Sequence, residues 1–247
     1  MAGLTLGAAR RENPARLSVS ATTRVGHPVR WTQAEIVLEP FARTSAALSS
    51  AELVTALEDG VREWNDALDD CGVPRLRVAR APSSVGRIRQ DERSVVLVRT
   101  GTWCSDGARD RGDCYDDGRA AITRLYPVQS AASERDGEVR EADIEINAVD
   151  YRWSLDGDAP GTRSLRAIVA HELGHVLGLE HSCAASPKSR ATGKSSPLPS
   201  CSASEEARAS ILFPEPVEPE RRLVLAPGHS EIATLCALYP RAHHPWF

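Results

Sequence analysis

The sequence is poor in lysine and aromatic residues and has no long apolar run. Only Lys188 and Lys194 are lysines, a bias that we attribute to a GC-rich genome and not to function. The formal net charge of −4 leaves no general basic surface, which argues against nucleic acid or an anionic membrane as a partner. No stretch approaches the roughly 20 apolar residues that a membrane helix needs. Residues 1–20 also lack the continuous apolar segment of a signal peptide.

Several chemical motifs are missing as well. No Cys-x-x-Cys pair occurs, which makes a structural zinc knuckle improbable. The sequence contains no P-loop, no dinucleotide-binding fingerprint and no serine nucleophile elbow. These absences argue against nucleotide-dependent enzymes and against serine hydrolases.

Six cysteines lie in turn-rich segments. An even number in such segments indicates disulfides and an oxidising compartment, so we expect a secreted, extracellular or cell-envelope protein. Short loop closure favours the pairs Cys104–Cys114 and Cys183–Cys201, which leaves Cys71–Cys236 by elimination. Free thiols are the alternative, and many other pairings remain open.

Hydrophobic patterns predict strands alternating with helices. Strands are predicted within residues 28–40, 76–79, 94–98, 120–125 and 142–148. Helices are predicted after the capping-box sequence Ser49-Ser50-Ala51-Glu52, from about residue 164 to 178, and over residues 230–238. The continuously apolar 94–98 run indicates a central strand, whereas the alternating 142–148 run indicates a half-exposed strand at an edge.

This order of elements predicts an α+β fold with a mixed α/β sheet. We expect a flexible tail over residues 1–24 and a single domain over residues 25–247. Residues 25–181 would form an upper lobe with the sheet, and residues 182–247 a smaller, irregular lower lobe.

The run HELGHVLGLEH combines residue types that suit a metal site. His171 and His175 are one helical turn apart, so both imidazoles can reach one ion at roughly 2.0–2.1 Å. Glu172 lies beside them and can act as a general base without being a ligand. Gly178 allows the chain to leave the helix through a left-handed conformation. That turn would bring His181 to the same ion, which a continuing helix would prevent.

Three neutral imidazoles leave a fourth coordination position open, which is typical of a catalytic zinc. Two histidines on a helix are usually ordinary side chains. The full run is much more specific, and we predict a zinc-dependent hydrolase acting on peptide bonds. Two alternatives remain: a zinc-bearing extracellular module that binds proteins without turnover, and a zinc hydrolase acting on non-peptide amides.

The same run, followed by Ser182, resembles the zinc motif of the metzincins and, among them, of the matrixin-like (matrix-metalloproteinase-type) enzymes. The resemblance implies a twisted, mostly parallel sheet with an antiparallel edge strand, an active-site helix and an irregular C-terminal lobe ending in a helix. It implies one catalytic Zn²⁺ held by His171, His175 and His181, with Glu172 as general base. It also implies a protein or peptide substrate and a monomer.

The segment ADIEI resembles the family's edge strand, against which substrate binds by strand addition. The resemblance therefore implies a substrate-binding role for Asp143, Ile144, Glu145 and Ile146.

The turn that gives the metzincins their name contains a methionine, but the only methionine here is Met1. The best match to the family's Met-Tyr-Pro turn is Leu212-Phe213-Pro214, to which the resemblance assigns a place at the substrate cleft. Leucine keeps the volume and apolarity of methionine, and such swaps usually cost under about 1.5 kcal/mol. A long insertion, residues 182–210, separates this turn from the third histidine.

Two further segments have weaker claims. Cys71-Gly72-Val73-Pro74 superficially resembles the matrixin cysteine switch but lacks the preceding Pro-Arg, so we favour a disulfide. An acidic cluster offers hard oxygens for Ca²⁺, yet it has no EF-hand spacing and contains arginines, so we favour a solvated loop. The acidic residues are Asp106, Asp110, Asp113, Asp116 and Asp117.

Overall fold

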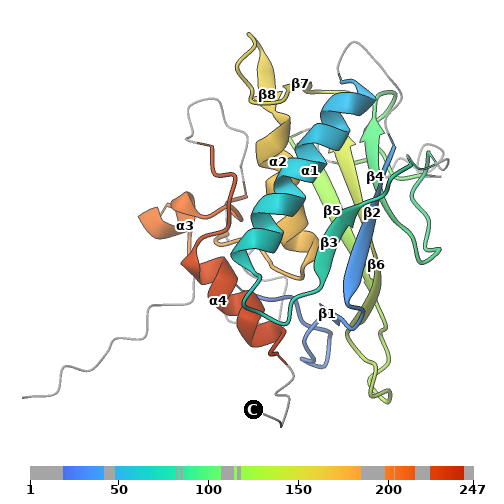
Figure 1. Cartoon of the computed structure of the whole chain (residues 1–247), viewed down its shortest axis with the longest axis vertical. Coiled ribbons are helices and arrows are strands. Elements are labelled where there is room, and N and C mark those ends of the chain that lie inside the picture. Colours follow the sequence, from blue (N-terminus) through green and yellow to red (C-terminus); the bar gives the residue numbers. More distant parts are fainter. Residues whose placement is uncertain are drawn as a thin grey trace, which may run out of the picture.

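The computed structural model contains one main sheet, with helices α1 (Ser50–Ala67) and α2 (Leu165–Val176) on one side of it (Figure 1). Among the residues that the structure describes, two short strands and two further helices accompany them: β7 (Arg152–Ser154), β8 (Thr162–Ser164), α3 (Glu205–Ala209) and α4 (His229–Leu238). The structure describes residues 19–41, 48–81, 83, 86–106, 114–115, 118–184, 198–202, 204–214 and 223–241.

The main sheet is mostly parallel. Its strands are β1 (Arg30–Trp31), β2 (Glu35–Phe41), β3 (Arg75–Val78), β4 (Ser94–Arg99), β5 (Ala121–Pro127) and β6 (Glu138–Asn147). The strand order is β1-β6-β4-β2-β3, all in parallel, and β5 pairs antiparallel with β6. A mixed, mostly parallel sheet with one antiparallel strand and a central β4 is confirmed. The predicted first strand is in fact two strands, β1 and β2.

The prediction that residues 142–148 form an edge strand is wrong. In β6, Ile144 is in register with Val96 of β4 on one side and with Thr123 of β5 on the other. The antiparallel edge strand is β5, whose other side has no partner strand among the described residues. The predicted alternation of side chains in β6 is correct, because Ile144 and Ile146 belong to the apolar core.

The polar face of β6 is buried, contrary to the half-exposed strand that we predicted. Glu145 is 0% exposed because side chains from neighbouring segments cover it. Its carboxylate pairs with Arg99 of β4 and Arg124 of β5 and accepts a hydrogen bond from the Tyr115 hydroxyl at 2.8 Å. Alternation along one strand cannot distinguish a face covered by water from a face covered by arginines of adjacent strands.

Helix α1 begins where the sequence predicts. The Ser49 side chain accepts a hydrogen bond from the Glu52 backbone N–H, and the Glu52 carboxylate accepts one from the Ser49 N–H, which completes the capping box. Trp64 is fully buried, and its indole N–H donates to the Ala170 carbonyl of α2 at 2.9 Å. This contact packs α1 directly against the helix that carries the histidines.

Part of the predicted flexible tail is ordered. Residues 1–18 lie outside the described part of the chain, but the segment from Val19 onward bonds to the loop after α2. The Ala21 N–H donates to the Gly178 carbonyl at 2.8 Å, and the Glu180 N–H donates to the Val19 carbonyl at 2.7 Å. The tail prediction fails here because the pairing partner lies more than 150 residues away, as the Ser20–Leu179 bridge shows.

The disulfides are Cys71–Cys236, Cys104–Cys114 and Cys183–Cys201, which confirms all three predicted pairs. The first joins the end of α1 to α4, so the C-terminal helix is covalently tied to the sheet-bearing part of the molecule. No helix within the described ranges is long and apolar enough to cross a membrane.

Candidate metal centre

Helix α2 is held from several sides. The Ser164 hydroxyl caps its first turn by accepting a hydrogen bond from the Ala167 N–H at 3.2 Å. Its residues are nearly all buried, because the helix packs against α1 and β5. This burial fixes the position of His171 and His175, which lie one turn apart on it.

Backbone carbonyls orient these two imidazoles. The Nδ1 atom of His171 lies 2.8 Å from the Ile211 carbonyl oxygen, and the Nδ1 atom of His175 lies 2.7 Å from that of Leu179. A carbonyl oxygen only accepts hydrogen bonds, so each Nδ1 carries the proton. Each Nε2 is then an acceptor, and a carbonyl behind the ring is the usual partner of a metal-binding histidine.

The two Nε2 atoms lie only 3.1 Å apart. Two acceptor nitrogens at this distance repel each other unless a cation lies between them. His181 joins them, and one nitrogen from each of the three rings lies within 4.8 Å of the others. The donor set, three imidazoles of which two have Nδ1 hydrogen-bonded to a backbone carbonyl, fits a zinc ion.

Gly178 makes this convergence possible. Its φ is +98°, the left-handed conformation predicted for the end of the helix. A Cβ at this position would lie 3.0 Å from the Val29 carbonyl oxygen, so a side chain would be crowded as well as strained. The chain turns back here and brings His181 to the two histidines of α2.

The His181 side chain is neutral at physiological pH. Burial is the main cause that lowers its pKa to about 3, and the positive charge of Arg119 acts in the same direction. A neutral imidazole has a lone pair to give, which a metal ligand requires.

Glu172 is 3% exposed and lies next to this cluster. Burial raises the pKa of its carboxyl group, and a hydrogen bond from Thr123 opposes that rise. The Thr123 hydroxyl of β5 donates to Glu172 Oε2 at 2.6 Å. Sequence reasoning missed Thr123, because only the pairing of β5 beside α2 brings it to the site.

Leu212 lies under the ligand helix and not in a cleft. It is 0% exposed, and a Cβ added to Gly174 of α2 would lie 2.8 Å from its Cδ2 atom. Phe213 is also buried and packs against Cys183 and Ala207. Substrate contact by Leu212 and Phe213 is therefore a wrong prediction, whereas for the half-buried Pro214 it stays a prediction.

The predicted substrate strand must also be corrected. Its four residues are 0% exposed, and both sides of β6 are occupied by β4 and β5 along this stretch. A peptide cannot add to a strand whose backbone is already paired twice. The residues affected are Asp143, Ile144, Glu145 and Ile146.

A buried carboxylate supports the Leu212 turn from α4. Glu231 is 2% exposed, and its Oε1 accepts a hydrogen bond from the Ser210 hydroxyl at 2.5 Å. The Ser210 oxygen in turn accepts from the Leu212 N–H at 2.9 Å. The carbonyl of Ile211, which lies between Ser210 and Leu212, is hydrogen-bonded to His171. This chain of contacts therefore links α4 to one of the three candidate zinc-binding histidines. Nothing in the sequence pattern marked Glu231.

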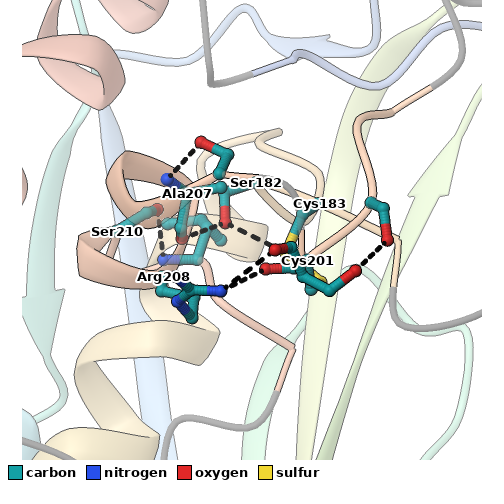
Figure 2. The surroundings of a disulfide bond; sticks show 10 residues. Ser182, Cys183, Cys201, Ala207, Arg208 and Ser210 are labelled. Atoms are coloured by element: carbon teal, nitrogen blue, oxygen red, sulfur yellow. Dashed lines mark hydrogen bonds between the residues drawn. A yellow bond between two sulfur atoms is a disulfide. The ribbon is translucent and has the colours of Figure 1, made fainter.

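Figure 2 shows the disulfide that follows the third histidine. Cys183 is joined to Cys201, and the Ser182 hydroxyl beside it donates to the Ala207 carbonyl at 2.9 Å. The Ser182 N–H donates to the Leu212 carbonyl at 2.9 Å. The base of the predicted insertion is thus closed by a covalent bond next to the site.

The acidic cluster proposed for Ca²⁺ has one member in the described part of the chain. Asp106 accepts two hydrogen bonds from the Arg99 guanidinium, at 2.7 and 3.1 Å, and one from the Ile88 N–H at 2.7 Å. Its oxygens therefore serve an ion pair. The other four members lie outside the described residues: Asp110, Asp113, Asp116 and Asp117.

Comparison with known families gives a match to the family model Matrixin over residues 117–188. No curated protein sequence matches the chain significantly. The matched segment contains β5, β6 and α2, together with the three histidines and the glycine turn. The sequence motif, the histidine cluster and this match over residues 117–188 make this part of the chain similar to the matrixin family of metalloproteases.

Proposed function

We propose that the protein is a zinc-dependent endopeptidase in which Glu172 is the general base. One observation carries this proposal: three imidazole nitrogens converge beside a buried carboxylate. Two of the rings have their second nitrogen bound to a carbonyl, as ligands require. A carboxylate that is adjacent to a metal site without being a ligand suits proton transfer.

Zinc held by three imidazoles polarises a substrate carbonyl and lowers the pKa of water toward about 7. The residues of the chain do the remaining work. Glu172 takes the proton of the attacking water and then delivers it to the leaving amine. Its burial keeps bulk water away from this transfer.

We infer that the substrate adds as a strand to the open side of β5. The Asn147 N–H donates to the Ala120 carbonyl at 2.9 Å, which makes this a hydrogen-bonded pair of the antiparallel ladder. Hydrogen-bonded and non-hydrogen-bonded pairs alternate along an antiparallel ladder. Counting from Ala120, every second residue of β5 therefore bonds to β6, and the backbone N–H and C=O groups of the residues between them point away from β6. An extended peptide can pair with these outward groups. They belong to Ala121, Thr123 and Leu125.

The test is the variant Glu172→Gln, measured on a quenched peptide library and by zinc analysis. We expect hydrolysis to fall about 10²- to 10⁴-fold, while zinc stays at about one per chain. Glu180→Gln is the matched control, since Glu180 belongs to the same motif but is exposed. The wild-type activity should be lost with a chelator and restored by zinc.

Undiminished hydrolysis by Glu172→Gln would refute its role as the base. Purified protein that takes up zinc but cleaves no peptide would favour the binding module instead. Chelator-sensitive cleavage of small amides alone would favour a hydrolase of non-peptide amides.

We further propose that the protein works outside the cytoplasm. The three disulfides support this, because such bonds persist in oxidising compartments. Alkylation of the protein isolated from its native source, without reduction, should label no thiol, and labelling of all the cysteines would contradict the proposal.

A further inference from the structure

We propose that Thr123 is a positioning residue, whose hydroxyl holds the Glu172 carboxylate in line with the strand that receives the substrate. The inference rests on the proposed function, since it names how the general base is oriented. It is carried by one contact and by the place of Thr123 in the ladder of β5.

The contact joins two side chains from different elements. Thr123 Oγ1 lies 2.6 Å from Glu172 Oε2 and 3.4 Å from the Glu172 backbone carbonyl. A hydroxyl has a single proton, and the shorter distance gives it to the carboxylate. The hydrogen bond engages Oε2, so we expect Oε1 to be the oxygen that accepts the proton of water.

Such a contact matters because a carboxylate rotates easily. The last torsion of a glutamate side chain is broad, unlike the staggered torsions nearer the backbone. Packing fixes the carbon chain of the buried Glu172, but a directional hydrogen bond is needed to fix the plane of its carboxylate. Thr123 provides one, and orientation is a main source of rate in a preorganised site.

Thr123 also connects the base to the substrate. It is one of the β5 residues whose backbone N–H and C=O point to the open side of the strand. Its side chain lies on the face of β5 that packs against α2, where Glu172 is. Thr123 would therefore position both groups: its backbone would bind the peptide, and its side chain holds the Glu172 carboxylate.

The strand that carries Thr123 is anchored on its opposite face. The next residue, Arg124, pairs with the fully buried Glu145 and bonds to the Tyr115 hydroxyl. The ladder to β6 fixes its register. An edge strand would otherwise be a poor support, because its outer side has no partner strand in the described part of the chain.

The experiment compares two replacements of Thr123. Thr123→Val keeps the shape and removes the hydroxyl, and we expect kcat about tenfold lower with KM within about twofold, because the backbone groups that bind substrate are unchanged. Thr123→Ser restores the hydroxyl and should keep kcat within about threefold of wild type. Thr32→Val is the matched control, since its hydroxyl donates to the Glu138 carboxylate at 3.2 Å on an exposed surface.

A second measurement does not depend on hydrolysis. The Tm values of Thr123→Val, Glu172→Ala and the double variant form a cycle, because each single change removes the contact, and the two Tm shifts should not add if the side chains interact. Additive shifts, or serine as poor as valine, would overturn the proposal. Non-additive shifts in a protein that cleaves no peptide would support the contact and reject the endopeptidase function, so the two failures are distinguishable.

Discussion

The sheet has two longer edge strands, β3 and β5, and they differ in whether their outward-facing backbone groups are hydrogen-bonded. At β3, the Asn65 side chain of α1 bonds to both groups of Leu76, accepting from its N–H at 3.0 Å and donating to its carbonyl at 2.9 Å. At β5, no partner strand covers the outer side among the described residues. Because an unpaired edge attracts other chains, proteins usually block it. One edge here is blocked, and the open one lies beside the histidine cluster.

The strands next to these edge strands, β2 beside β3 and β6 beside β5, differ in whether their acidic side chains are exposed or buried. Behind β3, Glu35 of β2 forms an exposed ion pair with Arg77 at 3.0 Å. Behind β5, β6 buries three acidic side chains on one face, at a cost that other groups must offset. Those three are Glu141, Asp143 and Glu145. The open edge is thus supported by costly buried polar contacts and the closed edge by ordinary surface contacts.

Among changes at the two edges, the largest effect is expected from blocking the open edge. Ala121→Pro removes an outward N–H of β5 without removing a bond to β6, and proline is tolerated at such edge positions. If substrate pairs there, kcat/KM should fall about 10- to 100-fold, since an unmade hydrogen bond costs about 1–3 kcal/mol. Peptide hydrolysis and thermal unfolding of the same preparation provide the measurement.

Ile122→Pro is the matched variant for this prediction. Its N–H faces β6 and not the open side, so it should lower the Tm, whereas Ala121→Pro should leave the Tm within a few degrees. Unchanged kcat/KM for Ala121→Pro in a folded protein would mean that the substrate does not pair with β5.

The features that the sequence predicted correctly depend on short spacings. The histidines of α2 are one turn apart, and Gly178 ends the helix by a local conformation that glycine favours. The capping box at Ser49 is equally local. Two of the disulfides close short loops, and the third followed by elimination. In each of these cases the partners are set by the chain itself.

The features that the sequence missed depend on which strands become neighbours. The edge was assigned to β6 because its residues alternate, but the arginines that cover Glu145 come from β4 and β5. Thr123 meets Glu172 across a strand–helix contact, and Glu231 supports the Leu212 turn from α4. No periodicity in a single segment encodes such pairs, so the zinc motif was predictable and its supports were not.

A pH-dependent effect should follow from the buried acids behind the open edge. Burial and the nearby charge of Glu141 raise the pKa of Asp143 to about 7. The unfolded chain loses this proton near pH 4 and the folded chain near pH 7, so wild-type stability falls as pH rises between these values. Asp143→Asn removes this loss, and its amide oxygen can still accept the Val95 N–H.

Denaturant unfolding at pH 5 and at pH 8 measures this difference. Relative to wild type, Asp143→Asn should gain stability toward pH 8, by up to about 1.4 kcal/mol for each pH unit crossed in the window. Glu35→Gln is the control from the other edge, and we expect its effect to be small at both values because its ion pair is exposed. A difference between Asp143→Asn and wild type that stays constant with pH would contradict the raised pKa.

The smallest effect is expected at the closed edge. Asn65→Ala leaves the outward N–H and carbonyl of Leu76 without their partner, which should cost about 1–2 kcal/mol of stability. Hydrolysis should change little, since α1 and β3 contribute no side chain to the histidine cluster and Asn65 does not take part in the contact of Trp64 with α2. The exposed edge should also promote self-association, detectable by size exclusion over a concentration series. The Asn65→Asp side chain can still accept a hydrogen bond from the Leu76 N–H but cannot donate one to the Leu76 carbonyl. The stability of this variant should therefore lie between that of wild type and that of Asn65→Ala. If Asn65→Ala remained as stable and as monomeric as wild type, Asn65 would not be blocking the edge of β3. The contrast between the two edges would then no longer support substrate binding at β5.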